Sequence, residues 1–160
     1  MKLSTKGRYA VTAMADLAAH ANGNPVPLAD IAARQDISLS YLEQLFGKLR
    51  RGNLVRSVRG PGGGYLLQRS AAATRIAEII LAVDEPIKAT RCLDGSPRGC
   101  HGSIGHCLTH DLWAALGAQI YDYLASVSLA DVVERRLAAG NGAVTQDHAK
   151  SAATAPGPVA

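Results

Sequence analysis

Apolar residues recur at three- and four-residue spacing through most of this chain, which is the pattern of amphipathic helices. The first such stretch covers residues 5–20 and ends at Asn22-Gly23. Its apolar face consists of Val11, Met14, Leu17 and Ala18. A second helix is predicted over residues 28–34, with Leu28, Ile31 and Ala32 on one face. The short break Gln35-Asp36-Ile37 then separates it from a third.

The third helix is predicted over residues 38–51. Its buried stripe consists of Leu39, Leu42, Leu45, Phe46 and Leu49. Two short helices joined by a turn of three or four residues describe a helix-turn-helix. The β-prone residues 54–58 and 65–67 flank a turn rich in Gly and Pro and predict a hairpin, the wing of a winged helix. A phosphate-binding loop is disfavoured, because the glycine run lacks the Gly-Lys-Ser/Thr ending and precedes a strand.

The second half of the chain contains three further helical patterns. Ile76, Ile79, Ile80 and Val83 share a face of a helix that we expect Pro86 to close. A long helix begins near Thr109. Its apolar stripe consists of Leu112, Trp113, Leu116, Ile120, Tyr123, Leu124 and Val127. A stripe this long must be covered, in part by the N-terminal domain and for the remainder by a second copy of the same helix.

A capping box formed by Ser128 and Asp131 predicts one more helix through Leu137, ended by Gly140. The remaining residues are small, polar and unpatterned, which is typical of a disordered tail. We therefore expect a mainly α protein with a small β wing. Its regions are a winged-helix DNA-binding domain (1–84), a Cys/His loop (85–110), a dimerisation helix with a C-terminal helix (111–139) and a tail (140–160).

Charge is distributed unevenly along the chain, although the formal net charge is only +4. Residues 1–70 hold ten Lys and Arg against four Asp and Glu, whereas residues 71–160 hold seven against nine. Between Glu43 and Glu78 there is no acidic residue but there are seven basic ones. Such a stretch is typical of a polyanion partner, and a solvated basic face is an equally open alternative. With the helix-turn-helix beside it, the partner that we expect is a double-stranded DNA operator.

In a helix-turn-helix the second helix lies in the major groove, and its first turns meet the base edges. The residues expected to face solvent and DNA there are Ser38, Ser40, Tyr41, Glu43, Gln44 and Lys48. Gln44 can read adenine, Glu43 can accept from a cytosine amino group, and the serines suit either base or phosphate. Helix capping is the alternative role for Ser38, and for Ser40 paired with Glu43.

Further basic residues are predicted to contact the DNA backbone and the neighbouring groove. Lys48, Arg50, Arg51 and Arg56 are placed for phosphates, so their contribution should depend on salt and not on sequence. Arg59 starts the wing turn, from which a guanidinium can reach the adjacent minor groove.

All three cysteines and three of the five histidines fall between Cys92 and His110. Cys92, Cys100, Cys107 and His110 form the pattern C-x7-C-x6-C-x2-H, and soft donors of this kind select an iron-sulfur cluster or zinc. Zinc sites usually show two close ligand pairs, whereas here only the last pair is close. The Gly-rich spacing therefore favours a 2Fe-2S cluster. His101 and His106 are spare candidate ligands, and an ordinary helix N-terminal position is the alternative for His110.

The N-terminus superficially resembles a signal peptide, but Thr12 and Asp16 interrupt its apolar run. No stretch approaches the ~20 apolar residues that span a bilayer. We expect a cytoplasmic protein with no membrane contact. An odd number of cysteines in a reducing compartment then favours metal or redox chemistry over disulfides.

Several segments of the chain resemble one bacterial family closely. These are MKLSTKGRYAVTAMADLA, PLADIAARQDISLSYLEQLFGKLRRGNLV, SVRGPGGGYLL and CLTHDLW. Over residues 1–135 they resemble the IscR family of iron-sulfur cluster regulators, which are winged-helix transcription regulators. The resemblance implies a homodimer that holds a 2Fe-2S cluster through Cys92, Cys100, Cys107 and His110. It also implies repression of cluster-assembly genes when clusters are plentiful. The gaps between the cysteines are longer here than in the best-known members.

Two other functions compete with a cluster-sensing regulator. The first keeps the fold and has the thiols sense nitric oxide, oxidants or zinc. The second is an electron-transfer or catalytic iron-sulfur protein, which would need a redox-partner surface or a substrate pocket. The sequence contains no nucleophile–base pairing or cofactor motif, so we expect no enzymatic activity and no small-molecule substrate.

Overall fold

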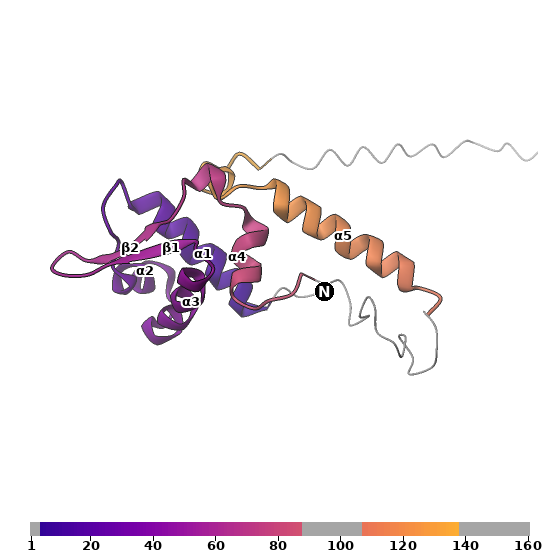
Figure 1. Ribbon diagram of the computed structural model, residues 1–160, viewed down its shortest axis with the longest axis horizontal. Coiled ribbons are helices and arrows are strands. Elements are labelled where there is room, and N and C mark those ends of the chain that lie inside the picture. The colour runs from indigo at the N-terminus through magenta and orange to yellow at the C-terminus, as the bar shows by residue number, and fades with distance from the viewer. Residues whose placement is uncertain (1–3, 88–106, 138–160) are drawn as a thin grey trace, which may run out of the picture.

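The computed structural model describes residues 4–87 and 107–137. In chain order the elements are α1 (Thr5–His20), α2 (Leu28–Gln35), α3 (Leu39–Arg51), β1 (Val55–Val58), β2 (Gly64–Leu67), the short 3-10 helix η1 (Ala71–Ala73), α4 (Ile76–Ala82), α5 (His110–Ser126) and α6 (Leu129–Val133). Figure 1 shows the first three helices and the hairpin gathered at one end, with α5 extending away beside α4. This is the expected mainly α fold with a small β wing.

Helix α1 is the centre of the described fold, since α2, α3, α4, α6 and β2 all pack against it. Its inner face carries the fully buried Met14 and Leu17, which meet Leu42 and Phe46 of α3 in one core. The ring of Phe46 packs edge-to-face on Tyr65 of β2, with ring centroids 4.9 Å apart. The wing is therefore attached to α3 through the core, so that the outer faces of both elements are fixed relative to each other.

The wing is an antiparallel hairpin in which Val55 pairs with Leu67 and Val58 with Gly64. Its turn needs glycine twice for backbone conformation, with φ of 104° at Gly60 and 72° at Gly62. Gly64 is required for another reason, because a Cβ there would lie 2.4 Å from the carbonyl oxygen of Val26. Backbone bonds between Val26 and Tyr65, both 2.9 Å, hold the two segments together. The glycine run thus serves the turn and its packing.

The connection between α5 and α6 is bonded to the start of α4. The amide of Ile76 donates to the carbonyl of Val127 at 3.1 Å, and the amide of Leu129 donates to Thr74 at 2.8 Å. Arg75 Nη1 also donates to the carbonyl of Ser126 at 3.1 Å. The long helix α5 is therefore bonded at its C-terminal end to the start of α4.

Helix α6 begins at the predicted capping box. The Oγ of Ser128 accepts from the amide of Asp131 at 3.1 Å, and the Asp131 carboxylate accepts from the amide of Ser128 at 3.0 Å. The expected extent to Leu137 is wrong, because the helix ends at Val133. Arg135 adopts a left-handed φ of 55°, and the amide of Arg136 returns to the carbonyl of Asp131, which terminates the helix early.

Three other local expectations are also wrong. Leu39 is the first residue of α3 and stands outside the core, 42% exposed. Helix α4 ends at Ala82 and not at Pro86, because Asp84 takes a left-handed φ of 58° after the cap. Val127 is an extended C-cap outside α5, where its carbonyl serves the bond to Ile76.

Most of the Cys/His loop and all of the expected tail lie outside the described residues, including Cys92, Cys100, His101, His106 and Gly140. None of the helices in the described part of the chain combines the length and the apolarity needed to cross a bilayer.

Candidate DNA-binding surface and metal-ligand pair

Helix α3 exposes a polar face opposite its core stripe. Ser40, Glu43, Gln44, Arg50 and Arg51 are all exposed. This face is built by the helical period, because Leu42, Leu45, Phe46 and Leu49 take the inner positions. Ser38 is the N-cap of α3, with its Oγ accepting from the amide of Tyr41 at 3.3 Å. The cap therefore belongs to Ser38, and the side chains of Ser40 and Glu43 stand at the outer surface.

Two of the residues expected to face solvent are partly enclosed. The ring of Tyr41 packs edge-to-face against Tyr9 of α1, with centroids 6.0 Å apart. Lys48 Nζ lies 2.6 Å from Asp84 Oδ2, and its side chain is only 27% exposed. Both residues lie at the sides of α3, where Tyr41 contacts α1 and Lys48 contacts the segment after α4.

The hairpin adds two exposed cations to the same end of the molecule. Arg56 lies on β1, and Arg59 stands at the start of the turn immediately before Gly60. Figure 1 shows this turn as the tip that reaches furthest from α5. A guanidinium at such a tip is free of the core and can reach outward from the hairpin.

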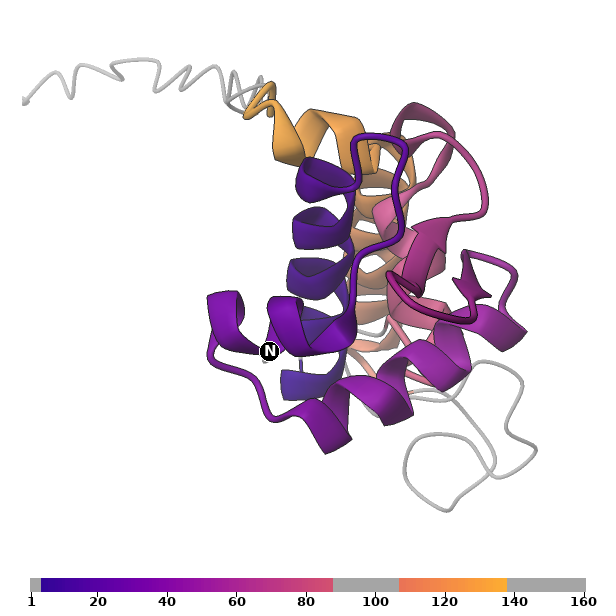
Figure 2. The same cartoon turned by 90° about the vertical axis from the view of Figure 1, so that its left-hand side faces the viewer.

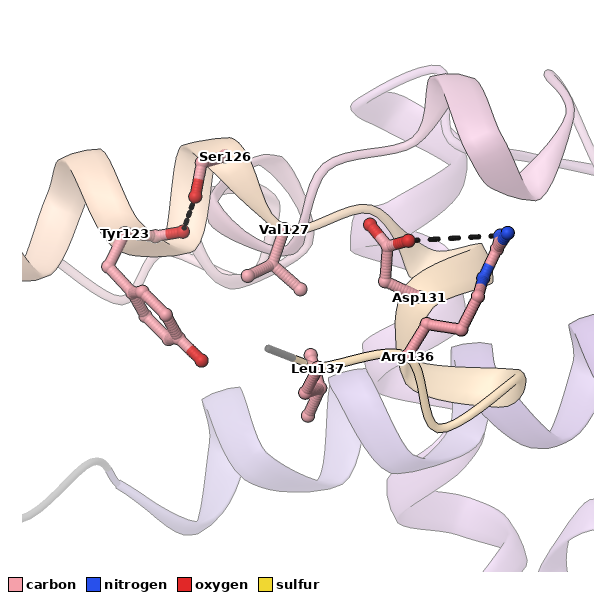
Figure 3. Close-up of a pocket in the computed structure, with 6 residues that line it drawn as sticks. All are labelled: Tyr123, Ser126, Val127, Asp131, Arg136 and Leu137. Atoms are coloured by element: carbon pink, nitrogen blue, oxygen red, sulfur yellow. Dashed lines mark hydrogen bonds and ion pairs between the residues drawn. The ribbon is translucent and has the colours of Figure 1, made fainter. Parts of the chain in front are cut away.

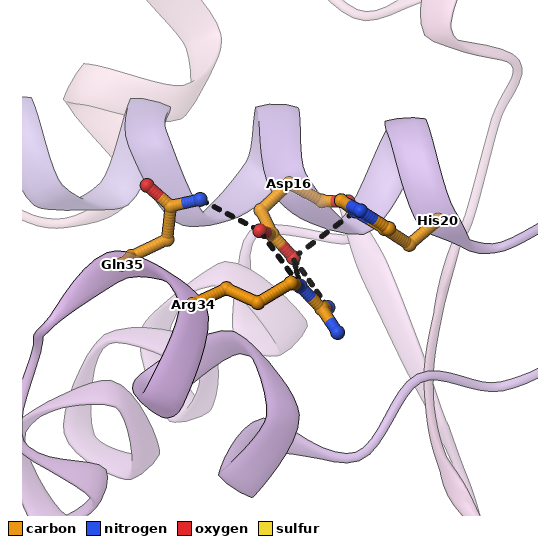
Figure 4. Close-up of polar contacts among 4 residues, drawn as sticks. All are labelled: Asp16, His20, Arg34 and Gln35. Atoms are coloured by element: carbon orange, nitrogen blue, oxygen red, sulfur yellow. Dashed lines mark hydrogen bonds and ion pairs between the residues drawn. The ribbon is translucent and has the colours of Figure 1, made fainter.

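A buried carboxylate fixes α2 against α1. Asp16 of α1 is buried, and Arg34 Nη2 donates to its Oδ1 at 2.6 Å while Gln35 Nε2 donates to Oδ2 at 2.7 Å (Figure 4). His20 Nδ1 lies 3.5 Å from Oδ1. Burial acts to raise the pKa of Asp16, but the hydrogen bonds from Arg34 and Gln35 and the nearby positive charge outweigh it, so the pKa is lowered.

This cluster lies directly before the turn that leads into α3. Arg34 and Gln35 are the last residues of α2, and Asp36 turns the chain with a left-handed φ of 52° before α3 begins. From the sequence, Asp16 was interpreted only as an interruption of an apolar run. An acidic residue between the buried Met14 and Leu17 was nevertheless a signal, since a buried carboxylate needs a partner.

The two described ligand candidates lie at the start of α5. His110 is the first residue of the helix and is buried, whereas Cys107 is half-buried. The amide of His110 donates to the carbonyl of Cys107 at 3.0 Å, which closes a tight turn between them. Cys107 Sγ also lies 3.7 Å from the hydroxyl of Thr109.

A thiol and an imidazole are thus held at one helix end, and both are donors that suit iron or zinc. Within the described residues no three metal-binding side chains gather, as the other two predicted cysteines lie outside that range. Cys107 and His110 are two of the four predicted ligands.

Two shallow openings border α6. One, of about 230 Å³, lies where α5 meets α6; Figure 3 shows Arg136 directed at Asp131, and their closest atoms are 3.8 Å apart. The other, of about 380 Å³, runs between α1 and α6 beside Asp16 and His20. The carboxylates of both openings are engaged by arginines or by a cap, so each serves the packing of its own helices.

A family model matches residues 3–135 of the chain. The chain belongs to the Rrf2 family of iron-dependent transcriptional regulators. It is therefore a DNA-binding transcription regulator with a winged-helix fold. A relative from Xenorhabdus nematophila, the HTH-type transcriptional regulator IscR, is 57% identical over 136 residues, which cover 85% of this chain and 81% of that protein.

Solved structures of Rrf2 regulators share the fold. The IscR of T. potens superposes with a TM-score of 0.70 at 37% identity, covering 85% of this chain and 88% of that one. CymR, the global cysteine regulator of B. subtilis, gives a TM-score of 0.70 at 32% identity and covers 84% and 98% of the two chains. The Rrf2 fold thus accommodates regulators that are named for different signals.

Proposed function

We propose that this Rrf2 regulator senses iron-sulfur cluster status and controls the genes of cluster assembly, acting mainly as a repressor. The observation that carries the proposal is the placement of Cys107 and His110 together at the first turn of α5, with Cys92 and Cys100 a short distance back along the chain. The IscR name of the relatives at 54–57% identity supports it.

The proposed cofactor is a 2Fe-2S cluster held by Cys92, Cys100, Cys107 and His110. When bound, such a cluster supplies a centre whose presence reports the supply of iron and sulfide and whose state responds to oxidants. The chain supplies three thiolates and one imidazole. The buried position of His110 shields that ligand from water, and Cys107 lies just before the N-terminal end of α5.

The proposed DNA interface is the outer face of α3 with the wing. Ser38, Ser40, Tyr41, Glu43 and Gln44 would lie in or beside the major groove, and Lys48, Arg50, Arg51 and Arg56 would meet phosphates. Arg59 would enter the adjacent minor groove. The exposure of Glu43, Gln44 and Arg59 supports this assignment.

The proposed assembly is a homodimer built on α5. Leu112, Leu116 and Tyr123 are 61%, 40% and 52% exposed and share one face of this helix, with Trp113 beside them at 37%. We expect the same apolar face of a second copy of the chain to cover it, because two identical apolar faces can pack against each other around a twofold axis. Such a dimer would place two α3 helices on one operator.

Anaerobic purification followed by iron and sulfide quantification tests the cofactor. The expected result is two irons and two sulfides per chain with visible absorbance, lost in Cys92→Ala and Cys107→Ala variants. His110→Ala should weaken retention, while His148→Ala, outside the predicted Cys/His loop, is the matched control and should leave it unchanged. Stoichiometric zinc without sulfide would favour the zinc-sensing alternative, and a metal-free protein that responds to oxidants or nitric oxide would favour thiol chemistry.

A further inference from the structure

The segment that follows α4 carries two adjacent acidic residues that contact different helices. Asp84 Oδ2 lies 2.6 Å from Nζ of Lys48, near the end of α3. Glu85 accepts from the amide of Ser4 at 2.8 Å and from the amide of Gly7 at 3.0 Å, and also from the hydroxyl of Ser4. One short segment is therefore bonded to both α3 and α1.

The ends of α3 and α4 approach closely, which fixes the position of Asp84. A Cβ added at Gly52, the C-cap of α3, would lie 3.0 Å from the Cβ of Ala82, the last residue of α4. The chain then turns sharply at Asp84, whose φ is 58° and whose amide donates to Leu81 at 3.0 Å. Glu85 adds a second anchor at the N-terminus of α1. The carboxylate of Asp84 is thus held beside α3 by its backbone as well as by its partner.

Asp84 lies near three basic groups, of which Lys48 and Arg51 belong to the proposed DNA interface and Lys6 does not. The hydrogen bond from Lys48 lowers the pKa of Asp84, and the charges of Lys6 and Arg51 lower it further. The side chain of Asp84 is 73% exposed, so a DNA phosphate that comes close to Lys48 also comes close to the carboxylate of Asp84. A phosphate and this carboxylate require the same ammonium group, and they repel each other.

We propose that Asp84 is a positioning residue for DNA binding, which holds Lys48 in an ion pair that must open before Lys48 can reach a DNA phosphate. It acts through Lys48 and does not itself touch a base. Its effect is to lower the affinity for all duplexes equally, because the contact that it competes with carries no sequence information. The proposal rests on the assignment of α3 as the DNA-contacting helix.

The experiment measures the dissociation constant of the full-length protein for two DNA duplexes across a range of KCl concentrations. One duplex is a binding site selected by the protein from a random library, and the other is of unrelated sequence. Asp84→Asn should tighten both by about two- to five-fold at moderate salt, the scale of an exposed ion pair. The plot of log affinity against log salt should steepen by about 0.9, which is one additional phosphate contact.

Two further variants separate this competition from a general change of charge. In the Lys48→Ala background, Asp84→Asn should give less than half of the gain that it gives in the parent protein. Glu134→Gln removes one negative charge from the segment after α6, where Glu134 pairs with Arg136 at 3.0 Å, and should leave affinity unchanged. In Figure 2 the short helix α6 lies at the top of the molecule and α3 at the bottom.

An equal gain in the presence and absence of Lys48, or an equal gain from Glu134→Gln, would overturn the role of Asp84. The interface has its own test in Glu43→Ala and Gln44→Ala. If these weaken binding to the selected site while Asp84→Asn is neutral, only the Asp84 assignment fails. If none of the variants changes binding, the assignment of α3 fails.

Discussion

Single carboxylates tie the helices of the winged domain to one another. Asp16 holds the end of α2 against α1, Asp84 holds α3, and Glu85 holds the N-terminus of α1. Each carboxylate accepts a hydrogen bond from a group far away in sequence. Each therefore fixes the position of one helix against another, which nondirectional apolar packing alone does not. Of the three, Asp16 is the most buried, so we expect its replacement to lower stability the most.

Asp16→Asn should destabilise the fold at neutral pH by about 1–3 kcal/mol, because it removes charge-assisted hydrogen bonds from Arg34 and places an amide donor against Gln35. Folding lowers the pKa of Asp16 below its ordinary value of about 3.9, so the stabilisation is present above that pH and is lost as pH falls through the folded value. Urea denaturation at pH 7 and near pH 3 measures it.

The difference between parent and variant should shrink at the lower pH. Asp122→Asn, an exposed acid on α5, is the control and should change stability by less than about 0.5 kcal/mol at either pH. A difference of the same size for Asp16→Asn at both pH values would contradict the ionised state assigned to Asp16.

Two glycines of the DNA-binding half should respond to alanine in opposite directions. Gly64→Ala should lower stability by about 1–3 kcal/mol, because its Cβ would meet the backbone of Val26 at 2.4 Å. Gly47→Ala should raise stability by about 0.5–1 kcal/mol, since Gly47 lies within α3 with no atom within 4 Å of the added group. Thermal unfolding of both variants checks this, and shifts of the same sign would contradict the assigned packing.

At the scale of elements, α3, the wing and α5 each present an outer face that no other described element covers. The outer face of α3 is polar, that of the wing is basic, and that of α5 is apolar. Each chemistry matches one kind of contact: base edges, phosphates and a second apolar helix. Helix α3 packs against both α1 and α4, the wing packs against α1 through β2, and α5 packs against α4.

The tip of the wing is predicted to read groove shape. Arg59→Ala should weaken binding most at sites with a narrow minor groove, because the negative potential there attracts an inserted guanidinium. Competition binding between duplexes with and without an A-tract beside the site measures this. Equal losses on operators and random DNA would reduce Arg59 to a phosphate contact.

The apolar face of α5 is predicted to hold the dimer. Leu112→Lys combined with Leu116→Lys should convert the protein to a monomer in sedimentation, because two charges would be buried at the helix contact. Leu39→Lys is a matched control, since Leu39 is 42% exposed on α3 and lies far from α5 along the chain. A dimer that persists in the double variant would exclude α5 as the interface.

Periodicity predicted the positions of α1 to α5, because the side of a helix that faces the core follows from its 3.6-residue repeat. The capping box predicted the start of α6, the last helix in the described part of the chain. The errors occur where tertiary contacts determine the residue at which a helix ends. Val127 leaves α5 to bond Ile76, and α4 stops early so that Asp84 can turn towards Lys48. Asp16 and Arg34 are 18 residues apart, so no local pattern could have paired them. Half of the proposed ligand set lies in the described residues, and its pairing with Cys92 and Cys100 remains a prediction.

In the whole molecule, the Cys/His region is bordered by two connections to the DNA-binding half. On one side Ile87 packs against the core directly after Asp84 and Glu85, which contact α3 and α1. On the other side α5 packs against α4 and ends in the bonds between Val127 and Ile76. A change at the ligands therefore has two covalent routes to the elements that hold α3, which is what coupling between cofactor and DNA requires.

The proposed regulation requires that cluster binding at the Cys/His site change the affinity of the protein for DNA. Its most direct test selects duplexes from a random library with the cluster-loaded protein and with the cluster-free protein, under anaerobic conditions and at one salt concentration. The affinities of both forms for both selected pools are then measured. The two forms should differ by about tenfold or more on at least one pool, which corresponds to a coupling free energy of about 1.4 kcal/mol. Equal affinities of the two forms for every selected duplex would contradict the account.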